Sequence, residues 1–374
     1  MVAREERRSR SSLATHMGCR RLYFFSREGS EMKAIVKARE DAGAMEVRDL
    51  PIPEPGPGEV LVKMKAAGIC FSDFMILTNK YKGRVPVPIP MIMGHEGAGE
   101  VAEVGKGVEH VKAGDKVGVN PLWGCGRCEY CLNGYPNMCM AWRHLGITCD
   151  GTFAEYRAVP AFTACKLPES VSPIDAAFLE PISLAVGTFE HVKPMLGDTV
   201  AIIGPGSIGL FHLQAFKSAG AAKIMVIGLD KDAKRLEVAK KLGADHIING
   251  SKGDVVKRVR ELTNGLGADI VVETANHPST VPLAVNLAAA KGRVRLFGLY
   301  PEATMSPLAL LRAGVTMIGD VATNTRYFLR AMRWIEYKKV LAEPMVTRSF
   351  RLDQAKEAFE TFTQGDTVKV LFEM

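Results

Sequence analysis

The chain has 374 residues, of which 47% are hydrophobic and 24% charged, and its net charge is +7. This length suits two domains that each bury a core of their own, and the composition is typical of a soluble globular enzyme. Seven arginines and four glutamates within residues 1–31 account for +3 of the charge, and the mild charge of the remaining residues predicts no nucleic-acid partner. No apolar run approaches the roughly 20 residues that span a bilayer, so we expect no membrane-spanning helix.

Residues 1–31 show no helical or strand periodicity, and we predict a disordered N-terminal extension there. From Ile35 to Val62 short apolar runs alternate with prolines and glycines, which is typical of strands joined by tight turns. The sequence therefore predicts a mainly antiparallel β domain over residues 32–182.

Beyond about Pro181 the pattern changes to apolar strands that alternate with amphipathic helices. The expected strands are 199–203, 224–227, 270–272, 294–297 and 316–318. Such alternation predicts a doubly wound parallel sheet over residues 183–320. Residues 321–374 add a helix at 327–337 and a strand at 368–372, and we assign them to the first domain.

Four of the eight cysteines, Cys125, Cys128, Cys131 and Cys139, fall within fifteen residues. Four thiolates on one short loop can surround a tetrahedral Zn²⁺, and metal binding can supply the folding energy of a loop with few apolar residues. A closed four-thiolate site is structural rather than catalytic. Cysteines clustered in this way favour metal ligation in a reducing cytoplasm over disulfides.

A His beside a Glu, flanked by glycines, stands at Gly94-His95-Glu96. By itself the pair suits either a buried metal site or a buried histidine with a salt-bridged neighbour. The surrounding pattern, G-H-E-x2-G-x5-G-x2-V, resembles the zinc signature of the medium-chain alcohol/polyol dehydrogenases. Within that family, the sequence most resembles the sorbitol/threonine/butanediol dehydrogenase branch. The signature positions are Gly94, His95, Glu96, Gly99, Gly105 and Val108.

The resemblance covers about residues 32–374 and implies a GroES-like catalytic domain with a Rossmann domain. It also implies a catalytic zinc held by Cys70, His95 and Glu180. At the position of Glu180, the third ligand, ethanol-type members of the family carry a cysteine and polyol-type members a glutamate. Glu96 matches a second carboxylate that can contact the metal directly or through water.

Two further residues complete the expected catalytic site. Ser72 suits a hydrogen bond to the substrate oxygen, and Asp73 suits acceptance of the second ring N–H of His95, although it could also serve as a helix N-cap. Many members carry a histidine where this chain has Met75, so the proton needs another route. We expect His144 to be a surface or loop histidine.

A glycine-rich turn follows the strand 199–203 and opens a helix, which predicts a dinucleotide site of the G-x-G-x-x-G type. Asp230 is the expected partner of the adenosine ribose, which favours NAD over NADP. If Gly228 faces the ribose instead, Lys231, Lys234 and Arg235 become candidates for a 2′-phosphate. The expected cofactor-binding residues are Gly204, Gly206, Ser207, Ile208, Gly209, Asp230, Arg235 and Gly298.

The implied activity is zinc-dependent hydride transfer between a secondary alcohol (a polyol, diol or amino alcohol) and NAD(P). Zinc would act as Lewis acid, and a homodimer or homotetramer is expected. Two alternatives stay open: an NADP-dependent carbonyl reductase of the same fold, and a non-catalytic nucleotide-binding relative.

Overall fold

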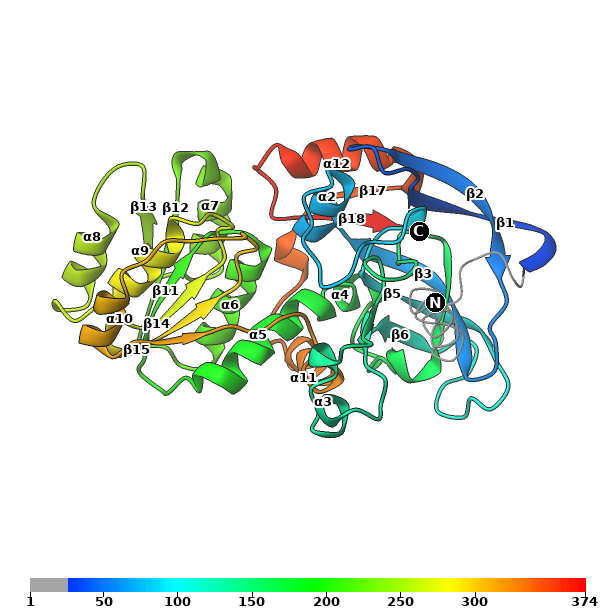
Figure 1. Ribbon diagram of the computed structural model, residues 1–374, viewed down its shortest axis with the longest axis horizontal. Helices are drawn as coiled ribbons and strands as arrows, with labels where there is room; N and C mark the ends of the chain where they lie inside the picture. Colours follow the sequence, from blue (N-terminus) through cyan, green and yellow to red (C-terminus); the bar gives the residue numbers. More distant parts are fainter. Residues whose placement is uncertain (1–25) are drawn as a thin grey trace, which may run out of the picture.

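The computed structural model describes residues 26–374, and it has two unlike halves (Figure 1). One half is built mainly from antiparallel strands, and the other is a six-stranded, all-parallel sheet with helices on both faces. The predicted combination of a GroES-like and a Rossmann domain is confirmed. Within residues 26–374, no helix has the length and apolar character needed to cross a membrane.

The first half centres on a seven-stranded sheet in the order β10-β6-β5-β3-β18-β17, with β9 also paired to β3. Smaller sheets of order β2-β1-β4 and β7-β8 flank it. The strands are β1 (Ser26–Lys37), β2 (Met45–Pro53), β3 (Glu59–Gly68), β4 (Met91–Ile92), β5 (Glu96–Val104), β6 (Lys116–Val119), β7 (Leu122–Trp123), β8 (Arg143–His144), β9 (Tyr156–Pro160), β10 (Ala164–Lys166), β17 (Val346–Phe350) and β18 (Lys369–Glu373). The helices are α2 (Phe71–Leu77), α3 (Glu129–Leu132), α4 (Pro173–Ala176) and α12 (Ala355–Thr363).

Strand β3 organises this half because it pairs with β5, β9 and β18. Its apolar side chains Val60, Val62 and Met64 point into one buried cluster, as the strand period of two requires. The end of β3 lies between β18 and β5, so that Gly68 pairs with Leu371 of β18 on one side and with Glu96 of β5 on the other. Residues that are far apart in the sequence therefore meet at the carboxyl end of β3.

The second half has the strand order β13-β12-β11-β14-β15-β16, the 3-2-1-4-5-6 order of a Rossmann sheet. Its strands are β11 (Thr199–Ile203), β12 (Lys223–Gly228), β13 (His246–Asn249), β14 (Ala268–Glu273), β15 (Ala288–Leu296) and β16 (Thr316–Ile318). Its helices are α5 (Leu179–Val192), α6 (Ser207–Ser218), α7 (Ala233–Lys241), α8 (Val255–Leu262), α9 (Thr280–Leu287), α10 (Pro307–Ala313) and the returning α11 (Thr325–Glu336).

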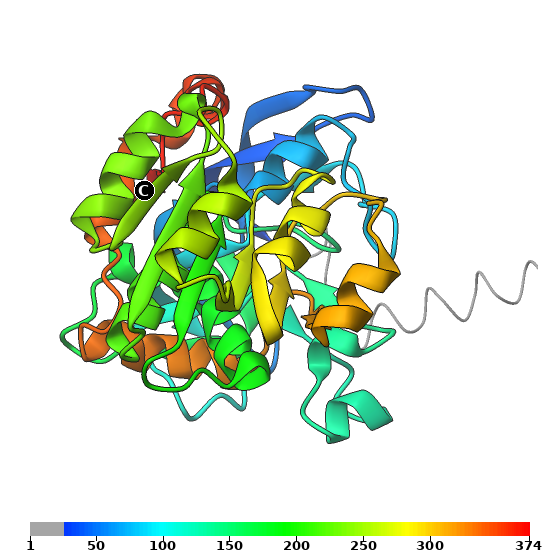
Figure 2. The same cartoon turned by 90° about the vertical axis from the view of Figure 1, so that its left-hand side faces the viewer.

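Helices cover both faces of this sheet (Figure 2), and alternate residues of β11 pack against opposite faces. Val200 and Ile202 join the cluster with α5 and α6, whereas Ala201 and Ile203 join the cluster with α8 and α9. Burial on both faces explains why the strand is a continuous apolar run instead of an alternating one.

Two expected boundaries fall inside regular elements. Strand β1 begins at Ser26 and pairs Glu31 with Pro51 of β2, so residues 26–31 are strand rather than a disordered extension; residues 1–25 lie outside the described residues. Backbone pairing with β2, which side-chain periodicity does not reveal, explains this difference. Helix α5 runs through the expected boundary at residues 182 and 183, and it packs on α11 with the rings of Phe189 and Trp334 5.2 Å apart.

Candidate functional site

Helix α2 begins directly after Cys70, which is its N-cap residue. The Oδ2 of Asp73 accepts a hydrogen bond of 2.9 Å from the backbone N–H of Cys70. This contact closes the first turn of the helix and places the Cys70 thiol at its N-terminus. Asp73 is fully buried, so its carboxylate is shielded from water.

The same carboxylate also faces His95. The Oδ1 of Asp73 lies 3.3 Å from Nδ1 of His95, while Nε2 of His95 lies 3.4 Å from the hydroxyl of Ser72. Asp73 thus faces the imidazole as expected, but it is not the helix N-cap: that residue is Cys70, and Asp73 holds the start of α2 from the third helical position. With Nδ1 facing Asp73, Nε2 is the nitrogen turned toward Ser72.

Cys70, His95 and Glu96 form a compact group whose possible ligand atoms all lie within 4.8 Å of one another. Glu180, in the first turn of α5, is buried but does not belong to this group. The pKa of Glu180 is raised to about 7: burial and the charge of Glu96 raise it, and the charge of His95 partly offsets them. Glu180 is therefore an electrostatic neighbour of the group.

Glu96 has a partner that the sequence reasoning missed. The Nζ of Lys369 donates to its Oε1 at 2.6 Å and lies 2.5 Å from Oε2, and both side chains are buried. Burial lowers the pKa of Lys369, but the Glu96 carboxylate raises it above its ordinary value. Gly68 leaves room for the pair, because a Cβ there would lie 2.2 Å from Oε2 of Glu96. The only signal in the sequence was a lysine within the apolar run 368–372.

The charges of this site favour a cation. Burial lowers the pKa of His95, yet the neighbouring Asp73 carboxylate and Cys70 thiolate raise it well above its ordinary value. A buried group of thiol, imidazole and carboxylates is also the donor set that zinc prefers. The residues present therefore fit a zinc ion.

His144 differs from the expectation. It is buried in β8, and its ring lies edge-on to His95 with 5.4 Å between ring centroids. The Nδ1 of His144 lies 2.8 Å from the carbonyl oxygen of Leu145, which requires Nδ1–H to donate and leaves Nε2 as an acceptor. Burial lowers the pKa of His144 to about 3, so the ring is neutral. The surface assignment was wrong because pairing of β7 with β8 folds this residue inward.

The four thiols of the cysteine lobe lie within 4.8 Å of one another, at Cys125, Cys128, Cys131 and Cys139. Backbone N–H donors, led by that of Arg127, lower the pKa of Cys125 to about 6, whereas burial raises the pKa of Cys131 to about 12. Four convergent sulfur atoms with at least one favoured as thiolate fit a structural zinc ion.

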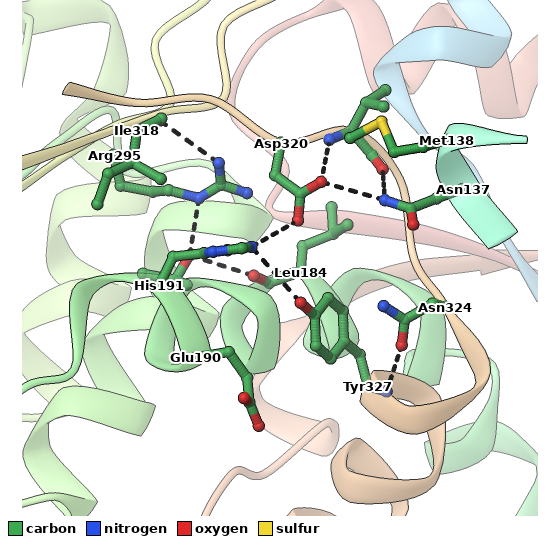
Figure 3. Close-up of polar contacts among 12 residues, drawn as sticks. Asn137, Met138, Leu184, Glu190, His191, Arg295, Ile318, Asp320, Asn324 and Tyr327 are labelled. Carbon is green, nitrogen blue, oxygen red and sulfur yellow. Dashed lines mark hydrogen bonds and ion pairs between the residues drawn. The ribbon is translucent and has the colours of Figure 1, made fainter. Parts of the chain in front are cut away.

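Asn137 attaches this lobe to the segment through which the chain leaves the parallel sheet (Figure 3). Its side-chain amide donates to Oδ1 of Asp320 at 3.1 Å and to the carbonyl of Val321 at 2.9 Å. The other Asp320 oxygen lies 3.0 Å from Nε2 of His191 at the end of α5. The lobe is therefore anchored to both domains.

The glycine-rich turn has the shape expected of a phosphate cradle. Gly204 ends β11 with φ of +101°, and Gly206 is the N-cap of α6. A Cβ at Gly206 would meet nothing within 4 Å, whereas one at Gly209 would lie 2.1 Å from the carbonyl oxygen of Gly204. Ser207 and Ile208 form the start of α6, where backbone N–H groups have no partner within the helix. The open space at Gly206 beside them fits a dinucleotide pyrophosphate.

Asp230 follows β12, and its side chain is 61% exposed. Its Oδ1 accepts a hydrogen bond of 2.7 Å from Asn249. Gly228 lies against the turn, since a Cβ there would be 3.1 Å from the ring of Pro205. Two of the three basic candidates have other partners: Lys234 pairs with Asp366 at 2.6 Å, and Arg235 donates to the carbonyl of Thr367 at 2.7 Å. The third, Lys231, is exposed.

Gly298 lies just beyond the carboxyl end of β15, where its backbone N–H donates to Oε2 of Glu273 at 3.1 Å. Glu273 is fully buried and also accepts hydrogen bonds from Thr280 and Tyr300. This carboxylate, which sequence reasoning missed, holds together the loops that follow β14 and β15.

Comparison with known proteins agrees with this architecture. The family model of the alcohol dehydrogenase GroES-like domain matches residues 56–169, and that of the zinc-binding dehydrogenases matches residues 207–337. The chain is 36% identical to L-threonine 3-dehydrogenase of Pyrococcus abyssi over 347 residues, which cover 91% of this chain and 98% of that protein. It is 32% identical to sorbitol dehydrogenase of Halalkalibacterium halodurans over 343 residues, with 91% and 98% covered.

Among solved structures, an Escherichia coli CFT073 alcohol dehydrogenase (rspB) complexed with NADH superposes with a TM-score of 0.85 and 32% identity. The match covers 92% of this chain and 100% of that one. With its two domains, its candidate metal groups and these similarities, the chain belongs to the zinc-binding dehydrogenase family with an alcohol dehydrogenase GroES-like domain.

Proposed function

We propose that this protein is a zinc-dependent dehydrogenase that transfers hydride between a small secondary alcohol and NAD. The observation that carries the proposal is the compact group of Cys70 with the buried His95 and Glu96, in a chain that also has the glycine-rich turn after β11. When bound, zinc supplies the Lewis acidity that makes a hydroxyl acidic near neutral pH, and the nicotinamide accepts the hydride.

The chain's own residues bind and orient. Cys70 and His95 would hold the zinc with Glu180, and Glu96, already paired to Lys369, is a further carboxylate near it. Asp73 orients the imidazole of His95, which fixes the nitrogen presented to the metal. The Ser72 hydroxyl, 3.4 Å from Nε2 of His95, would accept a hydrogen bond from the substrate hydroxyl and, as it takes up that proton, pass its own proton outward to water.

Two observations favour NAD over NADP. Asp230 follows β12 and has an exposed carboxylate, which would accept the ribose hydroxyls and repel a 2′-phosphate. Of the three basic candidates for a 2′-phosphate, Lys234 and Arg235 are already bound to Asp366 and Thr367, which leaves only the exposed Lys231.

The remaining expectations are also part of the proposal. Residues 32–182 with 321–374 would act as the catalytic domain and residues 183–320 as the cofactor domain. The protein would work as a homodimer or homotetramer in the cytoplasm, on a small molecule and with two zinc ions per chain, one of them in the cysteine lobe.

A coenzyme-reduction screen tests the proposal. Purified protein with measured zinc content is incubated with NAD or NADP and with polyols, diols and threonine. We expect reduction of NAD that disappears after chelation and returns with zinc. Turnover that persists in metal-free protein would contradict the proposal, as would a consistent preference for NADP.

A further inference from the structure

A cavity of about 330 Å³ lies between the two domains, beside the candidate zinc site. His144, whose ring lies edge-on to that of His95, lines it from the catalytic domain, and Leu299 and Tyr300 line it from the loop after β15. Met75 of helix α2 lines it as well. A substrate in this cavity would therefore reach from the metal group to the cofactor domain.

One wall of the cavity is strongly basic. Lys80, Lys82 and Arg84 all line it, within five consecutive residues of the segment after α2. Within residues 26–374 neither lysine forms an ion pair with a carboxylate, and both are exposed. Three nearby positive charges repel one another and create a positive potential inside the cavity.

The guanidinium of Arg84 is held in place by neutral groups alone. It donates to the carbonyl of Asn137 at 2.9 Å, reaches the sulfur of Met138 at 3.5 Å and lies 5.7 Å from the ring centre of Trp142. These contacts orient Arg84 without neutralising its charge.

No acidic side chain lines the cavity among the described residues. Two acids of the cofactor side contact lining residues of the cavity and are already hydrogen-bonded. Glu273 accepts from the hydroxyl of Tyr300, and Asp320 accepts from Asn137 and contacts His191. The charge of the basic wall is thus left for a ligand.

We propose that the alcohol substrate carries an anionic group, a carboxylate or a phosphate, which binds the wall formed by Lys80, Lys82 and Arg84. This proposal rests on the dehydrogenase function proposed above. The hydroxyl to be oxidised would lie at the His144 end of the cavity, on the side of His95, and the anion at the other. Charge-assisted hydrogen bonds from lysine and arginine are the contacts that recognise such anions.

The test compares three six-carbon compounds on the zinc-loaded enzyme with saturating NAD: sorbitol, gluconate and sorbitol 6-phosphate. At least one anion should have a kcat/KM about tenfold or more above that of sorbitol, a difference that shrinks with added salt. The double variant Lys80→Gln/Lys82→Gln should lose that preference. Lys106→Gln, which removes an exposed lysine outside the cavity, should retain it. The better of the two anions identifies the recognised group.

Calorimetric titration of the same compounds into the NADH-bound enzyme decides the proposal independently of turnover. The parent should bind an anion at least about tenfold more tightly than sorbitol, and the double variant should bind them alike. A parent that binds all three equally, or a double variant that keeps the parent's anion affinity, would overturn the anionic-substrate proposal. Zinc-dependent turnover of sorbitol in that case leaves the dehydrogenase function standing, whereas anion binding without turnover of any alcohol counts against that function alone.

Discussion

The two candidate metal groups of this protein are built in opposite ways. The cysteine lobe draws four thiols from fifteen consecutive residues, and three of those cysteines are partly exposed. The group around Cys70 combines a thiol, an imidazole and carboxylates from separate elements, and all but the thiol are buried. The lobe is a local fold closed by its own ligands, whereas the second group depends on the packing of the entire catalytic domain. Substitutions in the two should therefore differ in their effects.

The largest effect is expected at Cys70. Cys70→Ala should lower kcat by about a thousandfold or more, because zinc chemistry is worth several kcal/mol and each 1.36 kcal/mol is a factor of about ten. Zinc content should fall from two ions per chain to one, while NAD binding is kept. Metal analysis with steady-state kinetics measures both. Cys165→Ala, at a buried thiol outside both groups, is the matched control and should leave kcat unchanged.

Next is the buried pair of Glu96 and Lys369. Lys369→Met leaves the Glu96 carboxylate without its cation, so the free energy of unfolding should fall by about 3–5 kcal/mol. Urea titration measures it. The double variant Glu96→Gln/Lys369→Met should recover most of the loss, and if it is as unstable as the single variant, an unpaired charge is not the cause.

A smaller loss is expected in the cysteine lobe. Cys131→Ser should remove one zinc ion and lower Tm by roughly 5–10 °C, because the lobe has few apolar residues to fold around. At temperatures below its Tm, the variant should keep a kcat within about twofold of the parent's, since a closed four-thiolate site has no open position for substrate. Calorimetry and kinetics on one preparation check this, and a fall in kcat like that of Cys70→Ala would erase the distinction between the two groups.

The smallest effect is expected at Asp73. Asp73→Asn keeps an oxygen that can accept from the Cys70 N–H but removes the charge facing His95, so zinc affinity should fall about 10- to 100-fold. Competition with a chelator measures it. A variant that loses stability while keeping its zinc affinity would show that Asp73 serves only to cap α2.

Much of the architecture could be predicted because its signals are local. The apolar run at 199–203 followed by G-x-G-x-x-G is strand, turn and helix within a few residues, and it lies in the sheet as expected. Residues 26–31 escaped prediction because their strand depends on pairing with β2 and not on a pattern of their own. His144 escaped because only the pairing of β7 with β8 turns it toward His95.

By itself, the sequence determined the order of elements, the four-cysteine lobe and the glycine turn, since each is encoded within about fifteen residues. Only the tertiary structure decided that Glu96 meets Lys369 across 273 residues, that Asp73 contacts both Cys70 and His95, and that the segment 80–84 faces a cavity with the loop after β15. Such contacts arise from strand register and domain packing, and a linear pattern carries no information on which distant side chains these bring together.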